Sequence, residues 1–561
     1  MQRTKICQFD IASDAISRQR WIEFRLPRAV VAAGSRAWRR VPDARWAARR
    51  GFRHPAPHVL IAAAALCVVA CGPAGTAPPA GTLVIALESA PATLDPRFAT
   101  DANSSLVSAL VVSGLTRIGE HAEPVPDLAS EWRQLSPREY LFRLRTDARF
   151  HDGTPVTSAD VAATYRSVLD PALRSPKREA VGAIESVLTP DAVTVVFQLR
   201  AVTPALLEVT TLGILPARLA ATGPLPATRI VGAGPFRVAG APSDGSVDLA
   251  THSGYMDGAP QIPRLRVRIV PDGVMRALEL ASGTVHLVEN ALDPDLLPWL
   301  GRQAGLRVQI SPGTTFQYLG MNFRDPRLAD VRVRRALAHG VDREGLAREL
   351  MRDTVRPATG LLSPSHWAYE GAVARYPYAP EQAARLLVAA GLGPAVTDEL
   401  RRFSYKTSTV ELRRRIAEVF QAELGQLGLG LDIRSYEWAT FYDDIRHGNF
   451  QLYSLAWVGV SDPDVYYRIF HSTMQPPAGN NRAAYANPMM DRLLDEARRT
   501  DDRDVRRRLY AEVQRVAADD LPVIPLWWAD NVVVHSRALE AFTPAPDGDL
   551  RGLAQARLAA P

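Results

Sequence analysis

Cysteine is scarce in this chain of 561 residues, and it occurs only near the N-terminus. The three cysteines are Cys7, Cys67 and Cys71, so the chain beyond residue 71 has no disulfide, no cysteine-based zinc site and no thiol nucleophile. The sequence also contains no G-x-S-x-G, no H-E-x-x-H and no G-x-x-x-x-G-K motif. Its eleven histidines are scattered. These absences argue against serine hydrolases, zinc hydrolases and P-loop nucleotide-binding proteins.

The apolar run from Val59 to Ala70 is too short for a membrane helix. It has twelve residues, whereas a membrane helix needs about 20. Its length, with arginine and histidine upstream, is typical of a signal-peptide core. Cys71 directly follows it in a pattern that resembles the bacterial lipobox, and a plain secretory signal is the alternative. Two acyl chains on Cys71 would hold the protein to a membrane on the extracytoplasmic side, in the periplasm or on the outer face of the cell membrane.

Acidic residues are scarce in residues 1–70, which contain 13 of the 66 lysines and arginines but 4 of the 60 acidic residues. The rest of the chain has 53 basic and 56 acidic residues, so the formal net charge of +6 belongs to the N-terminal segment. A near-neutral body gives no electrostatic reason to expect a nucleic-acid partner. The apolar content of 47% is typical of a globular protein, and the length of 561 residues predicts two or more lobes.

The stretch from Leu141 to Asp170 carries the most informative pattern. Residues 141–145 alternate as in a half-buried strand, and His151 to Pro155 (HDGTP) form a turn. Thr157 with Asp160 three residues later resembles a capping box, and apolar residues then recur at helical spacing. The stretch therefore predicts strand, turn and capped helix. No second histidine or carboxylate follows at ligand spacing, so a turn histidine is favoured over a catalytic or metal-binding one.

The motif F-x-L-R-x-x-x-x-F-H-D-G-x-P-x-T-x-x-D-V over residues 142–161 resembles the hallmark of a known family. It is that of the oligopeptide-, dipeptide- and nickel-binding proteins (family 5) of ABC importers. Further resemblance is scattered from Leu83 to Trp528. It includes P-x-x-L-D-P at residues 91–96, G-x-G-P-F at residues 232–236 and L-P-x-x-P-L at residues 521–526.

The resemblance implies an α/β fold of the two-lobed, periplasmic-binding-protein-like kind (type II), with an extra lobe and with discontinuous lobes joined by a hinge. The expected division is a leader (1–70), a tether (71–81), lobe I (82–115, 230–310 and 520–561), the extra lobe II (116–229) and lobe III (311–519).

The resemblance also implies a function. The protein would bind a peptide-like or other small solute between its lobes and deliver it to an ABC permease and ATPase, as a monomer without a cofactor, a bound metal or any chemical reaction. A ligand that contacts both lobes only when they are closed shifts the open–closed equilibrium by that difference. The alternatives are an enzyme, a solute-sensing lipoprotein that partners a receptor, and a metal-chelate or haem binder of the same family.

Residues 451–463 (QLYSLAWVGVSDP) are the stretch expected to line the ligand site. In peptide-binding relatives the corresponding strand end adds the ligand backbone as an extra strand, and residues 456–459 would do this here. A buried core strand is the alternative. Ligand sites are mostly apolar and aromatic with a few polar groups. The expected ligand-binding residues are therefore Asn103, Tyr318, Trp438, Ala456, Trp457, Val458, Gly459 and Asp462. For Asn103 the alternative is that its loop only caps a helix.

Val460 departs from the family pattern. Peptide-binding relatives carry an aspartate three residues after the tryptophan, where it pairs with the terminal ammonium of the ligand. This chain has Val460 there, and Asp462 stands two positions later. A buried ammonium without a carboxylate partner costs several kcal/mol. The sequence therefore favours a ligand with a blocked or absent amine, such as a modified peptide or a non-peptide solute.

Three arginines, Arg332, Arg334 and Arg335, form a basic run after Asp330. A solvated helix face is favoured for them over a role in ligand binding.

Overall fold

The computed structural model describes residues 81–119, 123–203, 206–240, 246–460, 462–500, 502–545 and 547–559. Cys71, the apolar run before it and nearly all of the expected tether lie outside these residues. The described chain belongs to one unit, residues 78–561. Within it, no helix is both long and apolar enough to cross a membrane.

The main sheet has eleven strands in the order β15-β14-β16-β12-β17-β11-β1-β10-β9-β8, with β13 paired to β17. The strands are β1 (Thr82–Leu87), β8 (Phe236–Val238), β9 (Val247–Thr251), β10 (Arg264–Ile269), β11 (Leu287–Glu289), β12 (Leu306–Met321), β13 (Val355–Pro357), β14 (Arg402–Ser408), β15 (Gly430–Tyr436), β16 (Leu452–Trp457) and β17 (Val523–Ser536). Short strands β18 (Leu539–Glu540) and β19 (Arg557–Leu558) pair with each other.

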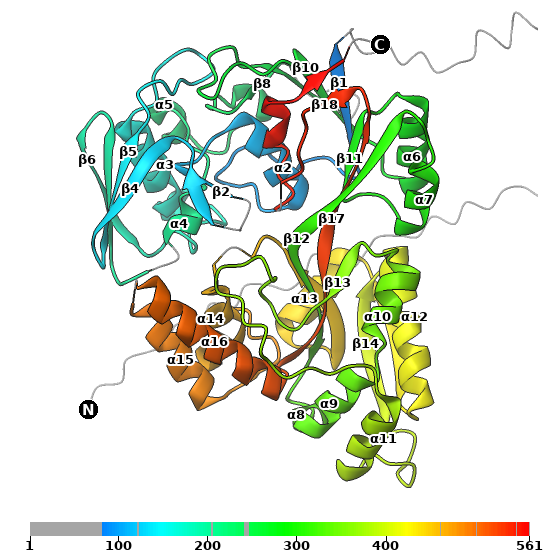
Figure 1. Ribbon diagram of the computed structural model, residues 1–561. Helices are drawn as coiled ribbons and strands as arrows, with labels where there is room; N and C mark the ends of the chain where they lie inside the picture. The colour runs from blue at the N-terminus through cyan, green and yellow to red at the C-terminus, as the bar shows by residue number, and fades with distance from the viewer. Residues whose placement is uncertain are drawn as a thin grey trace, which may run out of the picture. The chain divides into compact units, whose positions relative to one another are not determined.

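Two long strands, β12 and β17, connect the two halves of this sheet. They lie antiparallel and side by side, as the green and red strands in the middle of Figure 1 show. Leu306, at the start of β12, packs in one hydrophobic cluster, and Leu319, near its end, packs in another. The register of the pair shifts between Ser311 and Thr315. Gly313 lies in this irregular segment, where a Cβ atom would stand 2.4 Å from the carbonyl oxygen of Ala529.

A second, four-stranded antiparallel sheet has the order β4-β5-β7-β6. Its elements and those beside it are β2 (Thr116–Ile118), β3 (Pro124–Pro126), β4 (Ala129–Ser136), β5 (Glu139–Leu144), α3 (Ser158–Leu169), β6 (Ile184–Asp191), β7 (Thr194–Leu199), α4 (Leu206–Val209) and α5 (Ala217–Ala220). The predicted strand–turn–helix is confirmed as β5 and α3. The Asp160 carboxylate accepts the backbone N–H of Thr157 at 2.9 Å, which completes the predicted capping box.

The remaining helices pack against the main sheet or against one another, as α11 does against α9 and α15 against α16. They are α2 (Ala102–Val111), α6 (Gly273–Ser282), α7 (Leu297–Leu300), α8 (Pro326–Ala329), α9 (Val331–His339), α10 (Arg343–Gly345), α11 (Pro380–Ala389), α12 (Glu411–Gln426), α13 (Trp438–His447), α14 (Val465–Phe470), α15 (Pro488–Arg498) and α16 (Arg503–Asp520). One hydrophobic cluster includes Leu83 and Val107, another Phe142 and Tyr165, and a third Phe441 and Tyr510.

The P-x-x-L-D-P motif joins two segments that lie far apart in the sequence. Asp95, in the P-x-x-L-D-P motif, and Arg97, directly after that motif, form a fully buried ion pair at 2.8 Å. Arg97 also donates to the carbonyl oxygens of Ala220 and Gly223. Burying two charges is tolerated when they are paired and their remaining hydrogen-bonding capacity is met. These two side chains therefore fasten the loop after β1 to the chain after α5.

His151 joins the H-D-G turn to the G-x-G-P-F segment. The Gly232 N–H donates to Nδ1 of His151 at 3.2 Å, so the proton of the neutral ring sits on Nε2 and is donated to the carbonyl oxygen of Gly234 at 3.1 Å. The ring of His252 packs edge-on against His151, and its Nδ1 lies 3.1 Å from the same Gly234 oxygen. This is a structural role, as the turn pattern predicted.

The prediction of a solvated face for the basic run is wrong for Arg334. Arg332 is exposed on α9, but Arg334 is buried, and its guanidinium lies 4.3 Å from the ring centre of Phe323. It donates to the backbone carbonyl oxygens of Leu328, Ala329 and Asp520. A flexible arginine can place its head far along the chain, so helical spacing alone did not reveal the burial.

Candidate functional site

Strand β16 ends in the predicted ligand-binding stretch with one of its edges unpaired. On one side it pairs with β12, with Ala456 opposite Gln317 and Trp457 opposite Phe316. On the other side β14 pairs only with Leu452 and Tyr453. Within the part of the chain that the structure describes, residues 454–457 thus have no strand partner on that side. Their backbone N–H and C=O groups can accept an added strand.

The turn after β16 points its side chains in opposite directions. Val458 is 69% exposed. Gly459 has φ of 66°, a left-handed conformation that favours glycine, and nothing lies within 4 Å of where its Cβ would be. Val460 is 7% exposed and packs in the hydrophobic cluster of Tyr318 and Phe441. The valine that replaces the family's aspartate is therefore a core residue.

The charge of Asp462 is already matched within the protein. Its Oδ1 accepts from Nη2 of Arg506 at 2.8 Å, and both side chains are largely buried. The same oxygen accepts the backbone N–H of Asp464 and so closes the turn into α14. Asp464 in turn pairs with Arg498 at 3.0 Å. Asp462 stays a predicted ligand residue, but a ligand ammonium would compete with Arg506 for it.

Four side chains form an arginine–aromatic cluster beside the strand end: Tyr318 of β12, Tyr442 of α13, Trp457 of β16 and Arg482. The rings of Tyr318 and Trp457 stack with centroids 6.4 Å apart. Arg482 donates to the Tyr318 hydroxyl at 3.0 Å and to the Tyr442 hydroxyl at 3.3 Å. Its guanidinium lies 5.1 Å from the centre of the Trp457 ring, within cation–π range.

Trp438 extends the arginine–aromatic cluster toward solvent. It is the first residue of α13, is 51% exposed, and stacks on Tyr442 with ring centroids 5.6 Å apart. The guanidinium of Arg413, in α12, lies 5.6 Å from the centre of the Trp438 ring. Burial lowers the pKa of the Arg413 guanidinium from its ordinary value, and its Nη1 is buried without a hydrogen-bond partner.

Asn103 lies apart from this cluster in the contacts of the described chain. It is on α2, where Asp101 is the N-cap. Its amide donates to the carbonyl oxygen and the hydroxyl of Ser89 at 2.9 and 2.8 Å. The structure thus gives Asn103 a loop-fixing contact, while its proposed contact with a ligand stays a prediction.

The structure places Tyr318, Trp438, Ala456 and Trp457 near one another and adds two arginines that the sequence reasoning missed. Their contact with a ligand stays a prediction. Arg482 follows Asn480 and Asn481 in a loop without helical or strand periodicity, so no local pattern marked it. Its contact with Tyr318 spans 164 residues. The only sequence signal of unbalanced positive charge at this site was Val460, which stands where the relatives carry an aspartate.

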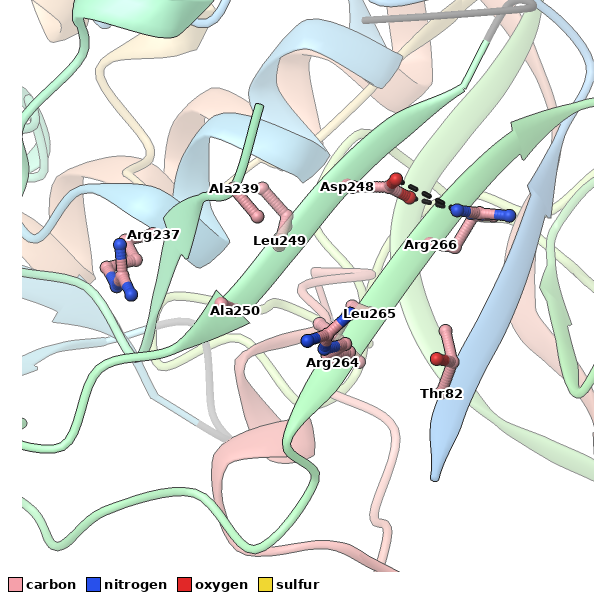
Figure 2. Close-up of a pocket in the computed structure, with 9 residues that line it drawn as sticks. All are labelled: Thr82, Arg237, Ala239, Asp248, Leu249, Ala250, Arg264, Leu265 and Arg266. Carbon is pink, nitrogen blue, oxygen red and sulfur yellow. Dashed lines mark hydrogen bonds and ion pairs between the residues drawn. The ribbon is translucent and has the colours of Figure 1, made fainter. Parts of the chain in front are cut away.

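A cavity elsewhere in the molecule has a different character. It has a volume of about 290 Å³ and lies against β1, β8, β9 and β10, far along the sheet order from β16. Figure 2 shows Arg237, Arg264 and Arg266 around it, with Arg266 bound to both oxygens of Asp248. A second cavity, of about 320 Å³, is lined by α11 and residues after it, including Val388 and Pro394. Neither contains a predicted ligand residue, and neither offers an aromatic wall.

Comparison with known proteins gives a family match over most of the described chain. The model of the family described as "Bacterial extracellular solute-binding proteins, family 5 Middle" matches residues 123–476. The dipeptide-binding protein of Escherichia coli (strain K12) is 27% identical over 311 residues, which are 55% of this chain and 57% of that protein. The matched region thus spans little more than half of this relative.

Another relative aligns over more of its length. The oligopeptide-binding protein AppA of Bacillus subtilis (strain 168) is 24% identical over 500 residues, 85% of this chain and 91% of AppA. Among solved structures, NikZ from Campylobacter jejuni in complex with Ni(L-His) superposes with a TM-score of 0.74 at 24% identity, covering 86% of this chain and all (100%) of that one. This likeness confirms the predicted two-lobed α/β fold.

Proposed function

The chain belongs to family 5 of the bacterial extracellular solute-binding proteins, and we propose that it captures a small solute between its lobes and passes it unchanged to the permease and ATPase of an ABC importer. The observation that carries this proposal is the unpaired edge of residues 454–457 beside the arginine–aromatic cluster. An edge of this kind binds an extended ligand through its backbone, and side-chain pockets next to it supply selectivity. We propose Tyr318, Trp438 and residues 456–459 as the wall of this site.

The proposed lobes follow the division expected from the sequence. Lobe I comprises residues 82–115, 230–310 and 520–561, lobe II residues 116–229 and lobe III residues 311–519. Strand β12 crosses the proposed boundary between lobes I and III at residues 310 and 311, and β17 of lobe I pairs with it on both sides of that boundary. A ligand held at the strand end of lobe III that also touches lobe I stabilises the closed arrangement, because those second contacts exist only there.

The proposed location is extracytoplasmic, in the periplasm or on the outer face of the cell membrane, with Cys71 as the lipid-modified residue. The support is the apolar run that precedes Cys71 in the sequence. Intact-mass measurement of the membrane-extracted protein tests this. A chain that begins at Cys71 and carries acyl groups supports the proposal, and release of a Cys71→Ser variant into the soluble fraction adds to it. A wild-type chain without acyl groups contradicts the anchor and leaves solute binding untouched.

Native mass spectrometry of protein purified without refolding tests the binding function. We expect a retained small molecule that is released on unfolding with the same mass it has in the growth medium or extract. Small-angle X-ray scattering should show a smaller radius of gyration when that molecule is added back. A profile that stays the same across a broad metabolite screen, or a bound compound that emerges chemically altered, contradicts the proposal.

A further inference from the structure

Arg482 is a buried cation for which the described residues supply no anion. It is 7% exposed, and a guanidinium stays charged at any physiological pH. Its hydrogen-bond acceptors are the hydroxyls of Tyr318 and Tyr442 and, at 3.3 Å, the side-chain oxygen of Asn480. The Tyr453 hydroxyl is a further partner. All four are neutral. No carboxylate of the described chain lies within ion-pair distance of Arg482, although a buried charge normally has a charged partner or several strong dipoles around it.

The other buried arginines of the described chain are compensated in one of two ways. Arg97 and Arg506 pair with the carboxylates of Asp95 and Asp462. Arg334 and Arg276 instead donate several bonds each to backbone carbonyl oxygens. Among these five buried guanidinium groups, Arg482 is the one that has neither arrangement. This difference indicates that the charge of Arg482 is compensated by an anion from outside the chain.

The surroundings of Arg482 connect it to the proposed ligand site. Trp457, under its guanidinium, is followed directly by exposed Val458. Tyr442, which accepts from it, stacks on the exposed Trp438. Arg413, which lies 5.6 Å from the Trp438 ring, is a second guanidinium without an ion pair among the described residues. Two cations therefore flank the same pair of aromatic rings.

Two of the acidic groups near this site, Asp444 and Asp462, form ion pairs with cations of the chain. Asp444 of α13 pairs with Lys406 at 2.6 Å, and Asp443 is an exposed residue whose carboxylate lies 3.3 Å from His447, which is charged only when protonated. Asp462 is held by Arg506. Glu437, the N-cap residue of α13, is an exposed carboxylate that accepts from the Thr409 hydroxyl at 3.5 Å. Position 460, where the relatives carry an aspartate, offers a core valine and no carboxylate to meet an ammonium, while the positive charge of Arg482 is left to meet an anion.

We infer that the solute carries a carboxylate and no free ammonium, and that Arg482, assisted by Arg413, binds this carboxylate beside Trp438 and Trp457. The inference rests on the proposed function and specifies its substrate class: amine-blocked, peptide-like acids. A guanidinium fork fits a carboxylate with two parallel N–H···O bonds, which are stronger than the bonds it makes to phenols. Extended backbone of the same ligand then lies along residues 454–457.

Calorimetric titration with two matched probe panels tests the inference. One panel consists of N-acetylated dipeptides with a free carboxylate, and the other of the same dipeptides as C-terminal amides. We expect the acids to bind at least roughly tenfold more tightly than the amides, because removing a charge-assisted bidentate contact changes affinity by at least this factor. Dipeptide amides with a free ammonium should bind no better than the acetylated amides.

Two arginine variants separate recognition from structure. Arg482→Gln should abolish the preference for acids, and Arg482→Lys should keep part of it, since lysine retains the charge but not the fork. Arg334→Gln is the matched control, a buried arginine stacked on Phe323, and it should lower thermal stability while leaving the preference intact.

Equal binding of acids and amides by the wild-type protein overturns the inference, and this comparison needs no variant to fold. Failure of every acid to bind, or a preference that survives Arg482→Gln, overturns it as well. In each of these cases the solute-binding proposal is judged separately, by the retained molecule and the scattering change.

Discussion

At the residue scale, Gly320 makes room for one ring of the core beneath the site. It faces Tyr453 across the β12–β16 pair, and a Cβ atom at position 320 would lie 2.3 Å from the ring. Tyr453 also packs edge-on against Tyr318 of the arginine–aromatic cluster. Gly320→Ala must displace this ring, and overpacking of a core typically costs about 1–3 kcal/mol. Chemical denaturation should show this loss, together with weaker binding of the native cargo.

Gly425 offers the matched control. It lies in α12, and nothing stands within 4 Å of where its Cβ would be. Gly425→Ala should stabilise the protein by about 0.5–1 kcal/mol through helix propensity. If both substitutions shifted stability alike, the close contact between Gly320 and Tyr453 would be refuted.

His151 makes the stability depend on pH on the acid side. Burial, followed by the nearby His252, lowers the pKa of His151 to about 4 from 6.5. Between these values the unfolded chain binds a proton that the folded protein refuses, so the stabilisation is present above pH 6.5 and is lost as the pH falls toward 4. Between pH 7 and pH 4.5 the loss should be roughly 2–3 kcal/mol. Urea midpoints measured between pH 7 and pH 4.5 should fall less steeply for His151→Asn than for wild type.

His447→Asn is the comparison for that experiment, because His447 is an exposed residue of α13. Its denaturation midpoints should follow the wild-type curve over the same pH range. A wild-type slope retained in His151→Asn would disprove the assignment.

Single residues near the site were only partly predictable from the sequence. Trp457 and Val460 stood out because a motif places them, and Val460 indicated that the ammonium partner is missing. The pairing of Asp462 with Arg506 spans 44 residues, and that of Arg482 with Tyr318 spans 164. Charge compensation of this kind depends on packing between distant segments, which no local spacing records.

At the element scale, local sequence signals were sufficient to predict β5 and α3. The capping residues before α3 and the alternation in β5 are short-range signals, and the structure has both elements where the pattern places them. The unpaired edge of β16 was not visible in the same way. It arises because the pairing of β14 with β16 ends at Lys406, two residues before β14 itself ends at Ser408.

Strand β11 carries a buried acid that should act in the opposite sense to His151. Burial, and then the nearby carboxylates of Asp549 and Asp547, raise the pKa of Glu289 well above its ordinary value. The unfolded chain therefore loses this proton first, and stability falls as the pH rises from about 4.5 toward the folded-state pKa. Glu289→Gln should raise the urea midpoint at pH 8 and leave it nearly unchanged below pH 4.5.

Glu411→Gln on the exposed face of α12 is the control and should change neither midpoint. A lower midpoint for Glu289→Gln at pH 8 would show that the ionised carboxylate stabilises the fold, contrary to this expectation.

At the scale of the whole molecule, the β12–β17 pair joins the elements that hold the site to the rest of the sheet. A side chain at Gly313 would meet the Ala529 carbonyl oxygen at 2.4 Å and force the two strands apart at their irregular segment. Gly313→Ala should therefore weaken binding of the native cargo and reduce the scattering change on ligand addition, although it lies outside the arginine–aromatic cluster.

Gly430→Ala, in β15 of the same sheet, meets only the flexible side chain of Arg402 and should preserve both measurements. Unchanged closure in Gly313→Ala would show that the connection between the halves does not depend on this crossing.

The bare margin of β16 has one more consequence. Unpaired strand margins invite neighbouring chains to dock on them, and natural proteins keep them short or covered. Here the margin covers residues 454–457 and is cut off by the left-handed Gly459. A ligand lying along this margin would cover its backbone groups, so the ligand-bound protein should self-associate less than the ligand-free protein.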